Sequence, residues 1–110
     1  MSNIAEYEKE VIRKLCEAHI SQGLLEEVLE KSEAKYEHSG AGYFLTFAHS
    51  ELPIERIVCD KPKLLGEWNG VDSGFIVFLE NGELTLECHP WGDKEIPSDY
   101  RKQPVKVLNV

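Results

Sequence analysis

The sequence lacks any long apolar segment. Its longest purely apolar run covers only residues 75–79, whereas a helix that spans a bilayer needs roughly 20 such residues. Residues 1–6 contain neither a basic stretch nor the apolar core of a secretion signal. We therefore expect no membrane contact and no export, and we assign the chain to the cytoplasm.

Cysteine is also scarce. The chain has three, Cys16, Cys59 and Cys88, and their wide spacing excludes a CxxC metal or redox motif. Their odd number argues against a closed disulfide framework, and a reducing compartment fits best. Cys16 and Cys88 are expected to be small buried hydrophobic residues.

Catalytic signatures are missing as well. The GxSxG, HExxH and dinucleotide-binding patterns do not occur, and the glycines within 39–42 lack the spacing of a phosphate-binding loop. Cys88 and His89 are neighbours, but successive side chains of a strand point to opposite faces, so they form no nucleophile–base pair. The sequence therefore predicts no catalytic residue and no cofactor, which favours a protein that is not an enzyme.

Positive charge is in short supply. Twelve Lys and Arg residues stand against twenty Asp and Glu residues, which gives a net charge of −8 over 110 residues. Such a balance repels nucleic acid and anionic membranes, and it excludes direct nucleic-acid binding. Two explanations stay open, because acidity can simply keep a protein soluble or can form an acidic face for a basic partner. The length suits one domain over residues 1–110.

Two amphipathic helices are expected over about residues 4–32. Asn3 and Glu6 form a capping box, and Gly23 is expected to end the first helix, after about Ile20, in a left-handed cap. One helix kinked at Gly23 is an alternative. Helical spacing relates the apolar residues Ile4, Tyr7, Val11, Leu15 and Ala18 in the first helix, and Leu24, Leu25, Val28 and Leu29 in the second.

Strands are expected over the remainder, about residues 35–110. The pattern of 35–48 indicates two short strands or one strand bent at its glycines, and 56–59 and 104–108 indicate further strands. The stretch 66–70 is typical of a turn. The expected fold is α+β, in which both helices pack on one face of a mainly antiparallel sheet of four to six strands.

The strongest local signal is Asn81-Gly82 between two apolar runs, which is the signature of a type I′ hairpin. If Glu80 pairs with Glu83, one face of the hairpin belongs to the core and the other mixes apolar and polar residues. The expected core pairs are Leu79 with Leu84, Val77 with Leu86 and Phe75 with Cys88, and the other face pairs Phe78 with Thr85, Ile76 with Glu87 and Gly74 with His89.

Binding residues are expected on the mixed face and in two turns. Tryptophan is enriched at interface hot spots, and Trp68 and Trp91 stand in polar or Gly-rich turns, although either ring can equally plug one end of the sheet. The predicted partner-binding residues are Ile76, Phe78, Glu87, His89, Trp91 and Trp68.

A metal site is a competing interpretation for Glu87 and His89, which stand two apart on one strand and point the same way. His38 or His49 would then supply a third ligand. Because no signature spacing supports this set, the sequence predicts no tightly held metal.

The aromatic strands and glycines of 39–45, 74–82 and 84–89 resemble those of a group of small uncharacterised bacterial cytoplasmic proteins. In size and acidity the chain is similar to the immunity proteins of contact-dependent and other polymorphic toxin systems, which block a toxin domain by binding it. That resemblance implies a protein-binding module for a basic cognate toxin such as a nuclease. The alternative, from another class, is a small metal-dependent or acid–base enzyme that uses Glu87 and His89.

Overall fold

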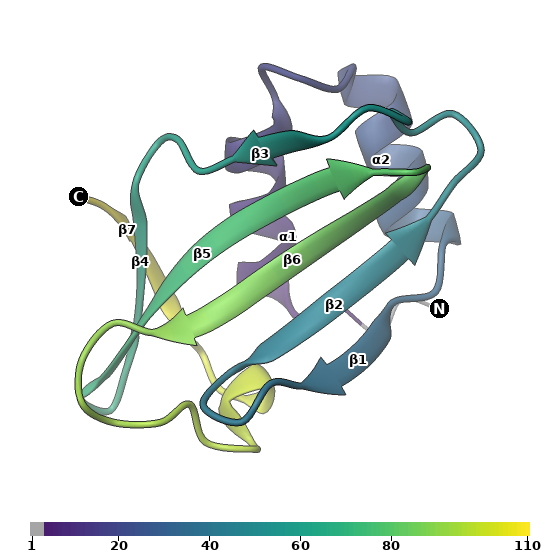
Figure 1. Ribbon diagram of the computed structural model, residues 1–110. Coiled ribbons are helices and arrows are strands. Elements are labelled where there is room, and N and C mark those ends of the chain that lie inside the picture. The colour runs from purple at the N-terminus through teal and green to yellow at the C-terminus, as the bar shows by residue number, and fades with distance from the viewer. Residues whose placement is uncertain (1–3) are drawn as a thin grey trace.

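A computed structural model describes residues 4–110. Two helices come first, and strands with one 3₁₀ helix follow (Figure 1). Within these residues, neither helix has the length and apolar character needed to cross a membrane. The elements are α1 (Glu6–Cys16), α2 (Gln22–Lys31), β1 (Lys35–His38), β2 (Tyr43–Ala48), β3 (Ile57–Cys59), β4 (Leu64–Trp68), β5 (Val71–Glu80), β6 (Glu83–Pro90), η1 (Tyr100–Lys102) and β7 (Lys106–Asn109).

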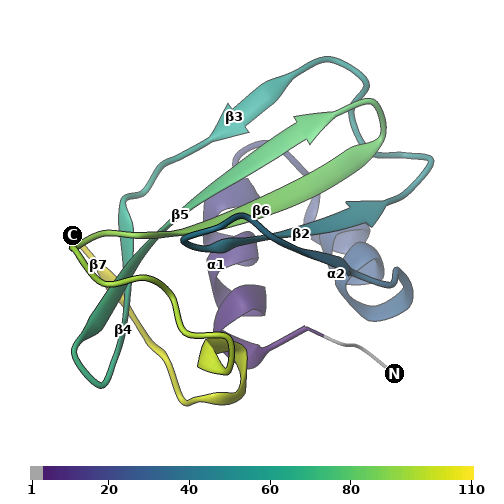
Figure 2. The same cartoon turned by 60° about the horizontal axis from the view of Figure 1, so that its bottom comes forward.

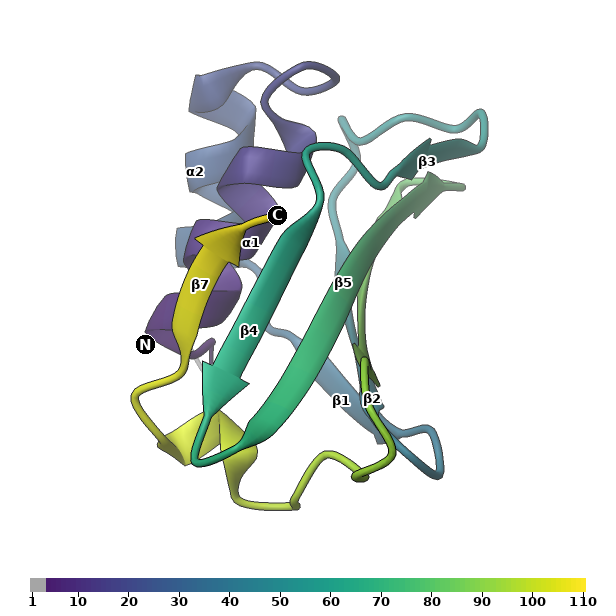
Figure 3. The ribbon, with the colours of Figure 1, turned by 90° about the vertical axis from the view of Figure 1, so that its left-hand side faces the viewer.

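The strands form one sheet in the order β1-β2-β6-β5-β4-β7, and β3 pairs with β5. All of its strand pairs are antiparallel. Both helices lie on the same face of this sheet (Figure 3), where α1 packs against β5, β7 and α2. The predicted α+β fold is confirmed. The sheet of the described residues has seven strands, one more than the predicted maximum of six.

The β5–β6 hairpin has the predicted register. Glu80 pairs with Glu83, and the inward and outward pairs follow as expected down to Gly74 with His89. Asn81 and Gly82 have φ angles of 54° and 75°, the left-handed values that a type I′ turn needs. The inward residues Phe75, Val77, Leu79, Leu84, Leu86 and Cys88 are all buried.

The extra strand comes from a second hairpin of the same kind. Residues 66–70 were expected to be a turn, but β4 continues to Trp68, which pairs with Val71. Only Asn69 and Gly70 turn, with φ angles of 52° and 79°. The Asn-Gly rule that predicts the β5–β6 hairpin applies here too, because both central residues again adopt positive φ.

The helix boundaries differ from the prediction. The first helix ends at Cys16, four residues before Ile20, and the second begins at Gln22. Gly23 therefore lies inside the first turn of α2 and is not among the glycines with positive φ. The separation into two helices results from Ser21, whose Oγ accepts a hydrogen bond from the Leu24 N–H at 3.3 Å and caps α2.

The start of α1 also differs from the predicted capping box. Asn3 lies outside the described residues, and Glu6 instead forms an exposed ion pair with Lys9. The carboxylate that accepts a hydrogen bond from the first N–H, that of Ala5, belongs to Glu8. Glu8 stands two residues further along the chain than Glu6, the residue that a box built on Asn3 would use.

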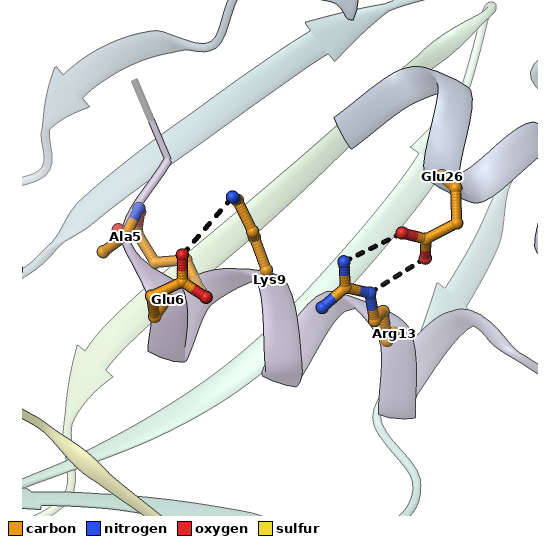
Figure 4. A network of polar contacts seen from close by, with 6 residues as sticks. Ala5, Glu6, Lys9, Arg13 and Glu26 are labelled. Carbon is orange, nitrogen blue, oxygen red and sulfur yellow. Dashed lines mark hydrogen bonds and ion pairs between the residues drawn. The ribbon is translucent and has the colours of Figure 1, made fainter. Parts of the chain in front are cut away.

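An ion pair joins the two helices on their exposed side. The Arg13 guanidinium donates from Nε and Nη2 to the two carboxylate oxygens of Glu26, each at 2.8 Å (Figure 4). These hydrogen bonds hold the pKa of the Glu26 carboxyl below its ordinary value. Beneath them, the buried faces of the helices carry Tyr7, Val11, Ile12, Leu15, Cys16, Leu25, Val28 and Leu29.

Candidate functional site

The helices leave one face of the sheet uncovered, and we call it the outer face (Figures 1 and 2). Residues paired across an antiparallel sheet point the same way, so the register arranges outer side chains in rows. Val58 is 44% exposed, and Ile76 and Phe78 are half-buried. One row consists of Glu37, Phe44, Glu87 and Ile76, and the next of Lys35, Thr46, Thr85, Phe78 and Val58.

Carboxylates surround these apolar rows. Six of them lie on the outer face of the paired strands, against two lysines. Arg56 adds a third cation, with its guanidinium carbon 5.2 Å from the centre of the Phe78 ring and its Nη1 3.3 Å from Glu80 Oε1. The outer face is therefore acidic, with Glu87 among the apolar side chains and the other carboxylates around them. The carboxylates are Glu37, Glu67, Asp72, Glu80, Glu83 and Glu87, and the lysines are Lys35 and Lys106.

A small cavity opens where the edge of β5 changes partner. β3 leaves β5 after Cys59 pairs with Val77, and β4 joins it where Leu65 pairs with Gly74. Residues 60–63, which belong to no strand, connect these two pairs. The resulting cavity of about 180 Å³ is lined by Asp60, Lys63, Leu64, Gly74, Phe75, Ile76, His89 and Trp91.

Five of the six predicted binding residues gather on this side of the molecule. The register places Ile76, Phe78, Glu87 and His89 on the outer face, and Trp91, 45% exposed, lines the cavity beside Ile76 and His89.

Trp68 lies elsewhere. Its partner Val71 is buried on the helix-covered face, and its ring meets Tyr100 edge-on with the ring centres 6.4 Å apart. For Trp68 the structure therefore shows the alternative role, in which the ring closes one end of the core.

The histidines proposed as third metal ligands do not join Glu87 and His89. His38 pairs with Tyr43, a buried residue, so it stands on the helix-covered side of the sheet. His49 lies beside the β5–β6 turn, where its backbone N–H donates a hydrogen bond to the backbone carbonyl of Gly82. That turn is at the far end of β6 from His89, so neither set of ligands is assembled.

His49 has different carboxylate neighbours. Its Nε2 is 2.6 Å from Glu27 Oε2, and its Nδ1 accepts a hydrogen bond from the Glu51 N–H at 3.1 Å. The proton therefore sits on Nε2 and is donated to Glu27. The ligand atoms of Glu27, His49 and Glu51 lie within 4.8 Å of one another, but these groups already pair and link α2 to the end of β2. The absence of a tightly held metal stays a prediction, which elemental analysis of protein purified without chelators can check.

The densest polar network lies under the helices. Glu8 is fully buried on α1 and takes four hydrogen bonds. Its Oε2 accepts from the Tyr43 hydroxyl at 2.5 Å and from Arg101 Nε at 2.7 Å. Its Oε1 accepts from the Ala5 N–H at 2.8 Å and from Arg101 Nη2 at 3.0 Å. The Tyr7 hydroxyl hydrogen-bonds that of Tyr43.

The charge state of this network favours a structural role. Burial is the main cause that raises the pKa of Tyr43 far above its ordinary value, and the negative charges that Cys88 and Glu8 can carry add to it. Burial and Glu8 do the same for Tyr7. Burial alone would lower the pKa of Arg101, but the hydrogen bonds and charge of Glu8 raise it. The hydroxyls therefore stay protonated around one satisfied ion pair that ties η1 to α1.

Sequence reasoning did not find this network. The available signal was the position of Glu8, four residues after Ile4 and three before Val11, on the apolar face of α1. A carboxylate on a buried helix face requires a partner. Arg101 carried no such signal, because it follows a polar connection.

Comparison of the chain with models of protein families, with curated proteins and with solved structures finds no match.

Proposed function

We propose that the protein binds a basic protein partner through its outer face. The observation that supports this most is the group of partly exposed apolar side chains Ile76, Phe78 and Val58, which no helix covers and which has carboxylates around it. Apolar patches with a polar rim are typical of protein interaction sites. The acidic rim favours a partner that presents lysines and arginines.

Each part of the outer face has a role in this proposal. Ile76, Phe78 and Val58 supply the apolar contact, and Glu87 in the middle meets a cation of the partner. Trp91, beside the cavity, is the expected hot spot, because an amphipathic ring that is already half-covered gains much buried area on contact. His89 lines the wall of the cavity below it.

We extend the proposal to an immunity protein that works in the cytoplasm and neutralises a basic toxin domain such as a nuclease. The acidic outer face and the resemblance in size and charge support this. The three cysteines are all free thiols, which suits a reducing compartment. Stoichiometric inhibition of the partner's enzymatic activity is the property that separates an immunity protein from other binding modules.

The test is co-purification from the native host, followed by mass spectrometry and kinetics on the partner identified. We expect Glu87→Lys to abolish capture and Trp91→Ala mainly to speed dissociation. Association with the wild-type protein should slow as salt rises, because the charges that steer it are screened over about 10 Å at 0.1 M ionic strength.

Glu30→Lys is the matched control, since it changes the net charge equally at an exposed position on α2. Capture should survive this substitution. If Glu87→Lys and Glu30→Lys abolish capture equally, the partner responds only to overall charge. If Glu87→Lys, Glu30→Lys and Trp91→Ala all bind the partner normally, the partner uses another surface. Either result would overturn the assignment of the outer face.

A further inference from the structure

Two of the three cysteines meet in the core, although they are 43 positions apart. Cys16 is the last residue of α1 and Cys59 the last residue of β3. Both side chains are buried, at 0% and 1% exposure, and each thiol is the first influence on the pKa of the other. In Figure 1 the end of α1 lies directly behind β3. The two sulfurs that a bond would join are therefore neighbours in the core.

Cys88 is placed differently. It lies in the middle of the sheet on β6, paired with both Tyr43 and Phe75, and burial raises the pKa of its thiol to about 12. The neighbouring Cys16 thiol instead lowers the pKa of Cys59, and a thiolate is the reactive form of cysteine. Because Cys59 also ends a three-residue strand that pairs only with β5, whereas Cys88 is enclosed between β2 and β5, we expect Cys59 to be the nucleophile and Cys88 not to react.

We propose that Cys16 and Cys59 form a reversible intramolecular disulfide by exchange with a low-molecular-weight disulfide. The Cys59 thiolate attacks one sulfur of the small disulfide and expels the other half as a thiolate, which takes up a proton. Cys16 then loses its proton and attacks the Cys59 sulfur, which expels the second half. The protein gives up two electrons and two protons, and the small disulfide becomes two thiols.

Access to Cys59 comes from the weakness of β3. This strand has three residues, pairs with β5 alone and is followed by residues 60–63, which belong to no strand. Its middle residue, Val58, is 44% exposed. Short edge elements with few pairing bonds open locally at low free-energy cost, and such an opening presents Cys59 while α1 keeps Cys16 in place. This inference is independent of the proposed function.

The experiment incubates the reduced, folded, full-length protein with oxidised glutathione, quenches with acid, alkylates the remaining thiols and maps the tryptic peptides. Cleavage at lysine and arginine separates the cysteines onto peptides 15–31, 57–63 and 64–94. We expect peptide 15–31 to be linked to peptide 57–63, and Cys88 in peptide 64–94 to be alkylated. Before alkylation, the intact protein should be lighter by two hydrogen atoms. The melting temperature should rise by about 10 °C, and dithiothreitol should reverse both changes.

Two variants make the test specific. Cys88→Ala should form the same disulfide, whereas Cys16→Ala should stop at glutathione bound to Cys59. If Cys16→Ala does not fold, the peptide map of the wild-type protein decides alone. The proposal is overturned if wild-type Cys59 remains a mixed disulfide, if Cys88 takes part, or if all three thiols are alkylated.

Discussion

The two faces of the sheet use the same strands for different purposes. Along β5, Val77 and Leu79 point under the helices and are fully buried, whereas Ile76 and Phe78 point outward and stay partly exposed. The helix-covered face also contains the satisfied Glu8 network, while the carboxylates of the outer face surround apolar side chains. Stability is therefore concentrated on one face, and the other is available for contact. Substitutions on the two faces should differ accordingly.

The largest effect should come from the buried carboxylate. Glu8→Ala removes the carboxylate that accepts hydrogen bonds from Arg101 and Tyr43, and removing one partner of a buried ion pair costs about 4 kcal/mol. Urea denaturation followed by circular dichroism measures the loss. Glu10→Ala, two residues on, removes only an exposed ion pair with Lys14 and should cost less than about 1 kcal/mol. Equal effects would mean that the network under the helices adds no stability.

Neighbouring residues of β5 test the two faces directly. Leu79→Ala leaves a cavity under the helices and should cost about 3 kcal/mol. Phe78→Ala removes a half-exposed ring that contacts Arg56 and should cost about 1 kcal/mol. The same denaturation measurement applies to both. A Phe78 variant as unstable as the Leu79 variant would show that the outer face is part of the core.

Two glycines sharpen the contrast through steric fit. A methyl group on Gly66 would come within 2.8 Å of Phe75 Cζ and would also collide with Ser73 Oγ, both fixed on the covered face. Gly66→Ala should therefore cost about 2 kcal/mol. On the outer face a methyl group on Gly74 would meet His89 Nε2 at 2.5 Å, and that imidazole can swing toward solvent, so Gly74→Ala should cost less than about 1 kcal/mol. Thermal melts of the two variants should rank them in this order.

The smallest effect lies outside both faces, at the Arg13–Glu26 pair. Because this pair lowers the pKa of Glu26 in the folded state, its contribution is complete above the pKa of the unfolded carboxyl and disappears as pH falls through the folded-state value. Glu26→Gln should cost about 0.5 kcal/mol at neutral pH and nothing in strong acid. Melting curves of the wild-type protein and of Glu26→Gln from neutral to acid pH check this prediction. A stability difference between them that grows as pH falls would contradict it.

Local signals predicted much of this fold. The β5–β6 register follows from Asn81-Gly82 and a period of two, both of which act over a few residues, and the same period places Ile76, Phe78, Glu87 and His89 on one face. The same reasoning should have found the Asn69-Gly70 hairpin, but the glycines and Trp68 before it resemble a longer turn.

Features that depend on distant residues could not be predicted. Nothing near Trp68 in the sequence indicates that Tyr100 covers its ring. The contact of Cys16 with Cys59 requires the packing of α1 under the sheet, which no spacing in the sequence encodes. The outer face was predictable as a surface, whereas its cavity depends on where β5 changes partner.

The hydrogen bonds between Glu8 and Arg101 join residues 93 positions apart, which affects how the protein is made. At a synthesis rate of about 5–20 residues per second, α1 exists for roughly 5–20 s before Arg101 is added to the chain. During that time the Glu8 carboxylate lacks the Arg101 guanidinium that pairs with it in the folded domain, and burying an unpaired carboxylate is costly. We therefore expect α1 to take its final position on the sheet only after Arg101 has been synthesised, with its apolar face exposed until then.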